Sequence, residues 1–173
     1  VESVSVEMKI VEDARSASID GVTLDRQIFK PGETVTARVR WVHYRASPTY
    51  TEATYSLALP EDLPDGQYRL LVGSSRMNMM AQRMEKPHLF RAESLPELLA
   101  RLNQLSAEPD NRLFLRLTLP TGGLAVKGTE LPDLPSYLTQ IYRESKRSDV
   151  QPYREAIISQ YDLPFTAEGG QSL

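Results

Sequence analysis

The chain has 173 residues, of which 40% are hydrophobic and 25% charged, so extensive disorder is excluded and a single domain is expected. It has no cysteine, which excludes disulfides and thiolate chemistry, and its two histidines are too few for a multi-histidine metal site. The net charge of −3 argues against nucleic-acid binding, and no apolar run approaches the ~20 residues that a membrane-inserted helix needs.

The N-terminal part of the chain reads as short strands. Residues 4–10 alternate apolar and polar side chains, which is the period of a half-buried strand. Residues 17–19 begin a weaker strand that we expect to end in a hairpin turn at Asp20-Gly21. Residues 22–29 are a third candidate strand, and Pro31-Gly32 then predicts a turn.

The clearest strands lie between residues 35 and 72. Apolar side chains occupy alternate positions, and Pro and Gly separate one strand from the next. Short strands at such regular spacing are typical of a β-sandwich. The positions predicted to face the core are Val35, Ala37, Val39 and Trp41, then Ala53, Tyr55, Leu57 and Leu59, then Tyr68, Leu70 and Val72.

The pattern becomes helical after Gly73. Methionines recur at helical spacing over residues 75–85 and predict a short amphipathic helix, with Ser74-Ser75 as its N-cap and Pro87 after its end. We expect this methionine stripe to pack in the core, and an adaptable binding face is the alternative. The stripe consists of Met77, Met80, Ala81 and Met84, with Met79 beside it.

Two further helices are predicted. Ser94 and Glu97 form a capping box before a leucine stripe, which predicts a helix over residues 95–105. A third helix is expected from Pro135 to Arg143, because Pro suits the first turn of a helix.

The remaining chain returns to β structure. Leu113, Leu115 and Leu117 alternate with other residues, residues 119–135 read as an ordered loop, and residues 153–161 as a last strand. The tail from Thr166 is rich in Gly and Ser, so we expect it to fray.

The predicted fold class is therefore mainly β with an α insertion, an Ig-like antiparallel β-sandwich carrying two or three short helices. We divide the chain into sandwich strands at 1–74, a helical insertion at 75–110, returning strands and a helix at 111–165, and a flexible tail at 166–173.

Catalytic chemistry is not visible in the sequence. His43 has the parity of a strand's inward face and is expected to pack, and His88 lies in a connector. Gly122-Gly123 reads as a hairpin turn, since a phosphate-binding loop needs a third Gly and a Lys. The acidic turn at Glu61, Asp62 and Asp65 has no known calcium-loop spacing. We assign no catalytic residue, no metal ligand and no cofactor.

Binding chemistry has one weak candidate. Tyr44, Arg45 and Tyr50 lie in or beside a predicted loop, where aromatic and guanidinium groups stack on a sugar or a peptide. Trp41 precedes this loop on an inward face, so we expect it in the core of the sandwich.

The order of segments along the chain carries a resemblance. The segments are Lys30–Thr36, Tyr44-Arg45, Leu59–Gly66, Leu70–Gly73, Ser94–Leu99 with Leu102-Asn103, Asn111–Leu115, Gly122–Pro135 and Arg154–Ala156.

This series, spread over residues 5–165, resembles the C-terminal region of bacterial SpoIVB-type serine peptidases, the S55 family. The resemblance implies an exported protein of the periplasm or cell envelope, with a serine peptidase domain N-terminal to Val1 and often a PDZ module. The chain begins at Val1, so we expect a processed chain or a fragment. None of the family's catalytic motif maps onto this chain, and no functional residue is carried over.

Three functions follow as hypotheses. The first is a non-catalytic accessory module that positions the peptidase domain or mediates protein contacts, through a sheet edge (also a route to homo-oligomers) or an apolar patch. The second is a peptide- or glycan-binding module that uses Tyr44, Arg45 and Tyr50. The third is a weak hydrolase using His43 or His88, which requires a hydroxyl and a carboxylate within reach of one imidazole.

Overall fold

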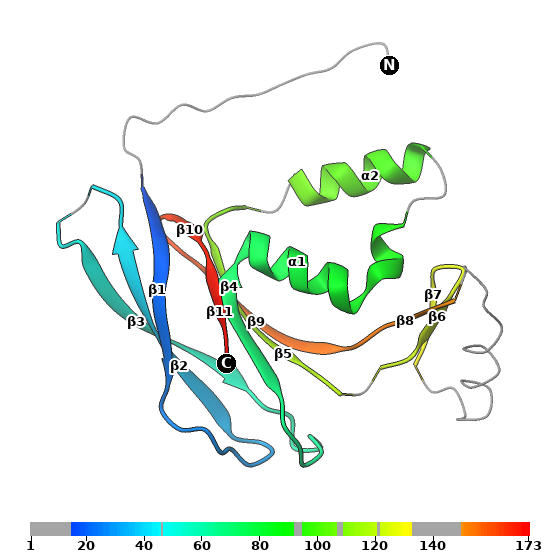
Figure 1. The fold of residues 1–173 in the computed structure, drawn as a ribbon, viewed down its shortest axis with the longest axis horizontal. Coiled ribbons are helices and arrows are strands. Elements are labelled where there is room, and N and C mark those ends of the chain that lie inside the picture. The colour runs from blue at the N-terminus through cyan, green and yellow to red at the C-terminus, as the bar shows by residue number, and fades with distance from the viewer. Residues whose placement is uncertain (1–14, 46, 92–94, 107–108, 121, 133–149) are drawn as a thin grey trace, which may run out of the picture.

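The computed structural model describes residues 15–45, 47–91, 95–106, 109–120, 122–132 and 150–173. The strand predicted at 4–10 and the helix predicted at 135–143 lie outside the described residues. The described chain is mainly β, with helices α1, η1 and α2 between the fourth and fifth strands (Figure 1). The predicted fold class is confirmed at this level.

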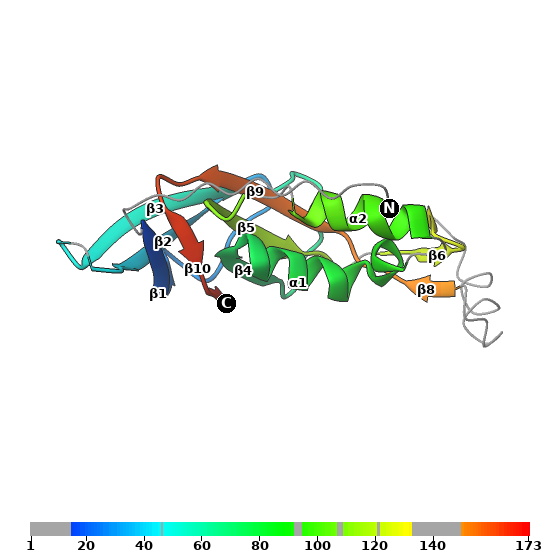
Figure 2. The same ribbon diagram turned by 90° about the horizontal axis from the view of Figure 1, so that it is seen from above.

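Two four-stranded sheets form the body of the molecule, which is consistent with the predicted sandwich (Figures 1 and 2). In the first sheet the order is β10-β1-β2-β3, and in the second it is β11-β4-β5-β9. The first sheet contains β1 (Ser16–Leu24), β2 (Thr34–His43), β3 (Tyr50–Ala58) and β10 (Thr166–Glu168). The second contains β4 (Arg69–Ser74), β5 (Arg112–Thr118), β9 (Ala156–Asp162) and β11 (Gly170–Ser172).

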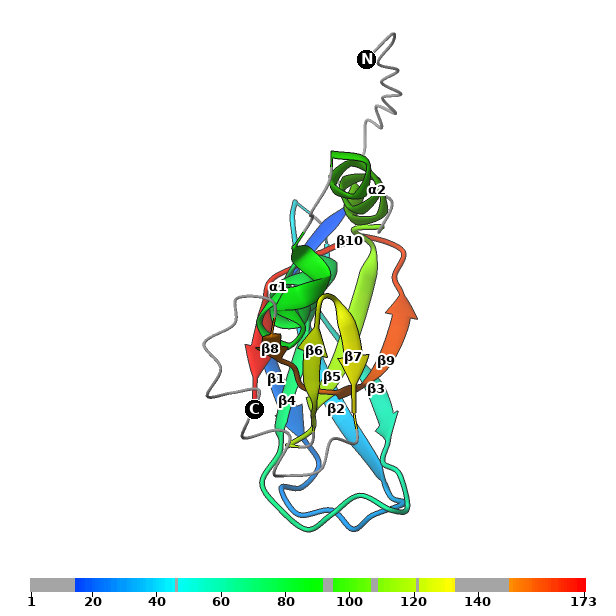
Figure 3. The same ribbon diagram turned by 90° about the vertical axis from the view of Figure 1, so that its right-hand side faces the viewer.

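A third, smaller sheet and the helices complete the fold. The small sheet lies at one end of the molecule, in the order β7-β6-β8 (Figures 1 and 3). Its strands are β6 (Leu124–Val126), β7 (Thr129–Leu131) and β8 (Val150–Pro152). The helices are α1 (Ser75–Glu85), the 3-10 turn η1 (Pro87–Phe90) and α2 (Leu95–Ser106). The helices predicted at 75–85 and 95–105 are both confirmed.

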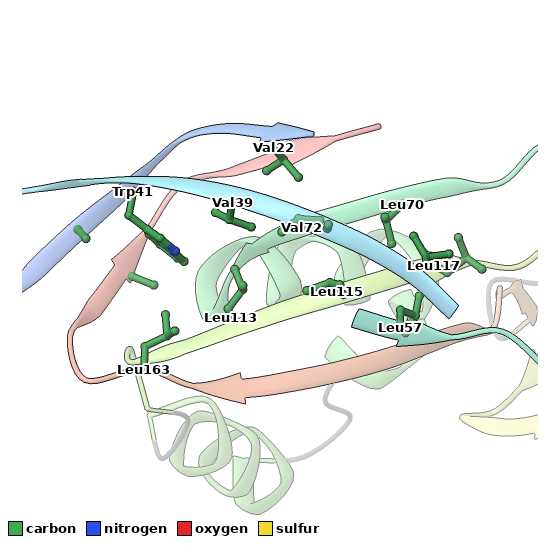
Figure 4. Close-up of a cluster of buried hydrophobic side chains, with 14 of the residues drawn as sticks. Val22, Val39, Trp41, Leu57, Leu70, Val72, Leu113, Leu115, Leu117 and Leu163 are labelled. Carbon is green, nitrogen blue, oxygen red and sulfur yellow. The ribbon is translucent and has the colours of Figure 1, made fainter. Parts of the chain in front are cut away.

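The hydrophobic core lies between the two large sheets (Figure 4). β2 buries Val35, Ala37, Val39 and Trp41, as the alternation predicted, because every second side chain points to the same face. Residues from β1, β3, β4 and β5 pack against this row. Trp41 is therefore a core residue, as expected.

β5 is the one strand of this core whose two faces both carry fully buried side chains along its length. Leu113, Leu115 and Leu117 enter the core, while Phe114 and Arg116 are buried on the opposite face. That opposite face is covered because α1 contacts it through Arg116. A central strand thus places one arginine beneath the helical insertion.

Both sides of the sandwich are closed by hydrogen bonds between the sheets. The hydroxyl of Tyr161 on β9 donates to the carbonyl of Ser56 at 2.6 Å and accepts its amide at 3.1 Å, which occupies the outer edge of β3. On the other side, the amide of Val22 donates to Gln171 Oε1 at 2.9 Å. Gly169, with φ of +83°, carries the chain from one sheet to the other between β10 and β11.

The tail prediction was wrong. Residues 166–173 were expected to fray, but within them β10 pairs in parallel with β1 and β11 pairs in antiparallel with β4. The glycines are there because two backbones approach closely: Gly170 faces Gly73 across the ladder. Glycine content indicated flexibility, whereas here it permits packing.

Three other local predictions also need correction. Asp20-Gly21 does not make a hairpin turn: β1 runs through it with a bulge between Ile19 and Gly21, because β2 is long enough to pair with both halves. The 119–135 loop contains the β6–β7 hairpin, whose turn residues Lys127 and Gly128 both have positive φ. The strand predicted over 153–161 begins later, as β9 at Ala156, and residues 153–155 connect it to β8, which was not predicted.

We predict that Gly170→Ala destabilises the protein by about 1–3 kcal/mol, since overpacking forces the backbone apart. A Cβ at this position would lie 2.9 Å from the Gly73 Cα and 3.0 Å from the Val72 carbonyl oxygen. Gly66→Ala is the control, because its Cβ meets nothing closer than a Tyr68 ring atom at 3.7 Å. Urea unfolding of both variants checks this; equal midpoints would mean that β11 is loosely held.

Candidate functional site

The face of α1 that packs on the sheet is mainly polar, and the prediction that the methionine stripe packs in the core was wrong for Met80 and Met84. Asn78 and Glu85 are buried, whereas Met80 is 46% exposed and Met84 is 84% exposed. The reason is the arginine on β5: a buried guanidinium requires a charged partner, so α1 presents its carboxylate to the sheet. Met80 and Met84 consequently turn to the outside, whereas Met77 is half-buried beside Gly73 and Gly170.

Glu85 and Arg116 form an ion pair at the centre of a buried polar cluster beneath α1, which also contains Asn78 and Thr118. Arg116 Nε donates to Glu85 Oε2 at 2.7 Å, and Nη2 donates to the same oxygen. Arg116 Nη1 donates to Asn78 Oδ1 at 3.0 Å, and the Thr118 hydroxyl donates to Glu85 Oε1 at 2.6 Å. Both carboxylate oxygens are therefore occupied, and the pair is closed to solvent.

A second network continues from the end of α1 into η1 and the small sheet. Lys86 Nζ lies 3.1 Å from Glu130 Oε2 and 2.9 Å from Glu155 Oε1. The buried His88 places Nε2 2.8 Å from Glu130 Oε1. Lys86 Nζ also lies 5.1 Å from the centre of the Tyr153 ring, and the ring of His88 meets the same tyrosine edge-on.

The charges of this second network shift two pKa values. Partial burial alone would raise the pKa of Glu130, but hydrogen bonds and attraction from Lys86 and His88 outweigh it and lower the pKa below its ordinary value. Burial alone would lower the pKa of Lys86, but its contacts with Glu155 and Glu130 raise it on balance. Both shifts favour the charged forms, so the network holds an ionised pair.

The two networks link α1 and η1 to the sheets. The contact between Glu85 and Arg116 links α1 to β5, and the contact between His88 and Glu130 links η1 to β7. The backbone adds a further link, because the amide of Arg154 donates to the Glu85 carbonyl at 3.0 Å. Since the Glu85 oxygens are occupied by Arg116 and Thr118, the carboxylate is not presented to a substrate as a general base.

The two histidines have different surroundings. His43 packs edge-on against Phe165, and its Nε2 lies 2.6 Å from the Thr51 hydroxyl. His88 was expected in a connector; it lies in η1, buried and bound to a carboxylate. The contact of His43 is with a hydroxyl and that of His88 is with a carboxylate, and the weak-hydrolase hypothesis stays untested.

The residues at the helix start and at the double glycine have packing roles. Ser74 is the N-cap residue of α1 but makes no side-chain capping bond, and the Ser75 hydroxyl donates to the Pro109 carbonyl at 2.7 Å. Gly122-Gly123 was predicted to be a hairpin turn and instead leads into β6. A Cβ on Gly122 would lie 2.0 Å from the Tyr153 carbonyl oxygen, so close backbone approach explains this glycine.

The candidate ligand residues lie at the β2–β3 end of the first sheet. Tyr44 and Tyr50 are exposed, and the guanidinium carbon of Arg45 lies 5.0 Å from the centre of the Tyr44 ring. Arg45 has a φ of 51°, in the left-handed region. These side chains are far in sequence from the residues of the buried cluster.

No metal site is formed by the part of the chain that the structure describes, since no three His, Asp or Glu side chains converge there. Glu61, Asp62 and Asp65 of the acidic turn are exposed. None of the described helices is long and apolar enough to cross a membrane.

Sequence reasoning missed Glu85 and Arg116, although a signal was present. Arg116 interrupts the apolar run Leu113–Leu117, whose length is typical of a strand buried on both faces. A single charge within such a run predicts a buried partner elsewhere.

The chain matches no family model, no curated protein and no solved structure.

We predict that Arg116→Met destabilises the protein by about 3–5 kcal/mol, because it leaves the Glu85 carboxylate buried without a countercharge. The double variant Glu85→Met/Arg116→Met should recover much of this loss, since it buries no charge. Arg112→Ala, which breaks the exposed pair with Asp162, is the control and should cost less than about 1 kcal/mol. Thermal unfolding compares the three; a small loss for Arg116→Met contradicts the anchoring role.

A second prediction concerns pH. The folded-state pKa of Glu130 is lowered, so its stabilising contribution is present above the ordinary value of 4.5 and is lost as pH falls through the folded pKa. Glu130→Gln should therefore be less stable than the parent at pH 7, and the difference should vanish below that pKa. Lys86 contributes until pH rises through its own raised pKa, above 10.5.

Urea midpoints of parent and Glu130→Gln between pH 3 and pH 8 provide the measurement. Glu168→Gln, at an exposed position of β10, is the matched control. A difference that stays constant across this range would show that the charge of Glu130 is not what stabilises the network.

Proposed function

We propose that the chain is a non-catalytic accessory module of an exported bacterial protein of the SpoIVB (S55) peptidase type. In this proposal the helical insertion contacts the peptidase domain of the same protein and positions it, and the protein acts in the periplasm or cell envelope. The Ig-like character of the sandwich is part of the proposal. The resemblance of the segments supports the family, and the surface of the helices supports the role.

The observation that carries the role is the exposure of apolar side chains on the helices. We call these residues the helical surface: Met80 and Met84 on α1, Leu89 on η1, and Leu95 and Leu99 on α2. Half of the ten large hydrophobic residues that are exposed in the described chain come from this one short stretch. Exposed apolar side chains on elements that follow one another in the chain are consistent with a contact surface.

The sandwich itself offers less for such a contact. The outer edge of β3 is occupied at Ser56 by the Tyr161 hydroxyl, which disfavours pairing with another strand there. The outer face of β2 carries Arg38 and Arg40, and Arg40 pairs with Asp20. Contact through the helices is therefore favoured over strand pairing along the outer edge of β3.

A second candidate function is binding of a peptide or glycan at the β2–β3 end. Its support is the exposure of Tyr44 and Tyr50 and the guanidinium of Arg45 beside the Tyr44 ring. Stacking of exposed aromatic and guanidinium groups is suited to a sugar ring or an extended peptide.

We predict that the complete gene encodes a serine peptidase domain upstream of Val1, and that this domain, when purified, binds the chain. The double variant Met84→Gln/Leu99→Gln should weaken binding by about tenfold or more, because burial of each apolar side chain contributes on the order of 1.5–3 kcal/mol. Ile28→Gln is the control, since Ile28 is 84% exposed, as Met84 is, but lies between β1 and β2. Titration calorimetry measures the affinities.

The proposal fails if the gene encodes no such domain, or if the double variant binds as tightly as the parent. For the second candidate, Tyr44→Ala/Tyr50→Ala should abolish retention on peptidoglycan-derived glycans or a peptide array while the melting temperature stays within about 2 °C of the parent. A lowered melting temperature with unchanged retention would assign the two tyrosines to packing.

A further inference from the structure

The exposed side of α1 has a composition unlike that of an ordinary solvated helix. Arg76, Met80, Arg83 and Met84 are all exposed and fall within one arc of the helix, opposite the buried Asn78 and Glu85. We call these four residues the Arg-Met stripe. Arginine and methionine are enriched in protein interfaces, whereas lysine and the acidic residues are depleted there.

The stripe carries positive charge that its own helix does not balance. The only acidic residue of α1 is Glu85, and it is buried and already paired with Arg116. Within the described residues, neither Arg76 nor Arg83 forms an ion pair. The whole chain has a net charge of −3, so this basic face stands out from an acidic molecule.

We propose that the Arg-Met stripe binds an acidic amphipathic helix, and this proposal deepens the accessory function by naming the chemistry of its partner. Arg76 and Arg83 are seven residues apart, which is two turns or about 10.5 Å along α1. A partner helix with carboxylates at the same seven-residue spacing pairs with both. Apolar side chains between those carboxylates then cover Met80 and Met84.

The anchor beneath α1 makes this face a rigid one. Glu85 and Asn78 both bind Arg116, so the rotation of α1 about its axis is fixed. A surface held in one orientation loses little conformational entropy on binding.

Two other occupants fit the stripe less well. A second copy of the chain presents the same arginines, so a symmetric contact brings like charges together. An anionic membrane surface calls for a helix with large apolar residues such as Trp, Phe and Leu on one face, and the exposed apolar side chains of α1 are two methionines. Charge complementarity therefore favours an acidic protein segment.

The test uses the full chain and a labelled 21-residue peptide of three heptads, with Leu at the core positions and Glu on the flanks, kept below its self-association concentration. Its matched control carries Lys in place of Glu. We expect the Glu peptide to bind in fluorescence anisotropy, and Arg83→Glu to weaken binding at least tenfold. Met84→Gln should weaken it several-fold, and raising salt from 50 to 500 mM should weaken it as well.

Arg38→Glu, an exposed arginine on β2, and Ile28→Gln should leave the affinity unchanged. Equal binding of the Lys peptide, no effect of Arg83→Glu, tighter binding to phosphatidylglycerol vesicles, or concentration-dependent dimerisation through α1 would each overturn the proposal. The accessory function is separable: if the peptidase domain binds and Met84→Gln/Leu99→Gln weakens that binding while Arg83→Glu does not, only the acidic nature of the partner is wrong.

Discussion

The buried ion pair between Arg116 and Glu85 determines how the helical insertion sits on the sandwich. β5 is a central strand whose outward face lies beneath α1, and an arginine on that face cannot be covered by an apolar helix. The helix that covers it must bring a carboxylate and place it within hydrogen-bond distance. Glu85 does this from the last turn of α1, and the neighbouring Lys86 and His88 extend the fastening to the small sheet.

Two opposing free-energy terms, burial of methionine and loss of the ion pair, decide which side of α1 faces the sheet. Burying both Met80 and Met84 would contribute on the order of 3–6 kcal/mol. Rotating α1 so that these methionines face the sheet would separate Glu85 from Arg116 and expose Asn78. The arginine would then be buried without a countercharge, which costs about 3–5 kcal/mol. The two terms are of similar size, and the hydrogen bonds that Thr118 donates to Glu85 and that Asn78 accepts from Arg116 favour the polar arrangement. The exposed methionines are a consequence of the ion pair.

The sequence predicted the parts of the fold that depend on local periodicity. In β2 the alternation of side chains coincides with their burial, so the strand was located correctly. The helices at 75–85 and 95–105 were located by the helical spacing of their methionines and leucines, together with the Ser residues that precede them. The prediction for the inward face of α1 was wrong because Arg116, which pairs with Glu85, lies about thirty residues further along the chain. β10 and β11 were missed for the same reason, since their partners β1 and β4 lie far from them in sequence. Local pattern contains no information on such distant partners.

The buried cluster around Glu85 and Arg116 and the exposed face of α1 have different roles. A catalytic constellation leaves a reactive atom facing a substrate, whereas here the atoms of Glu85 and Arg116 face each other inside the fold. An apolar contact between α1 and β5 would hold the helix but would tolerate rotation about its axis, because dispersion is not directional. Directional hydrogen bonds from one guanidinium to Glu85 and Asn78 permit a single rotation. The face of α1 that remains outside is therefore always the one with Arg76 and Met80, and a surface with a fixed orientation is what recognition of a partner requires.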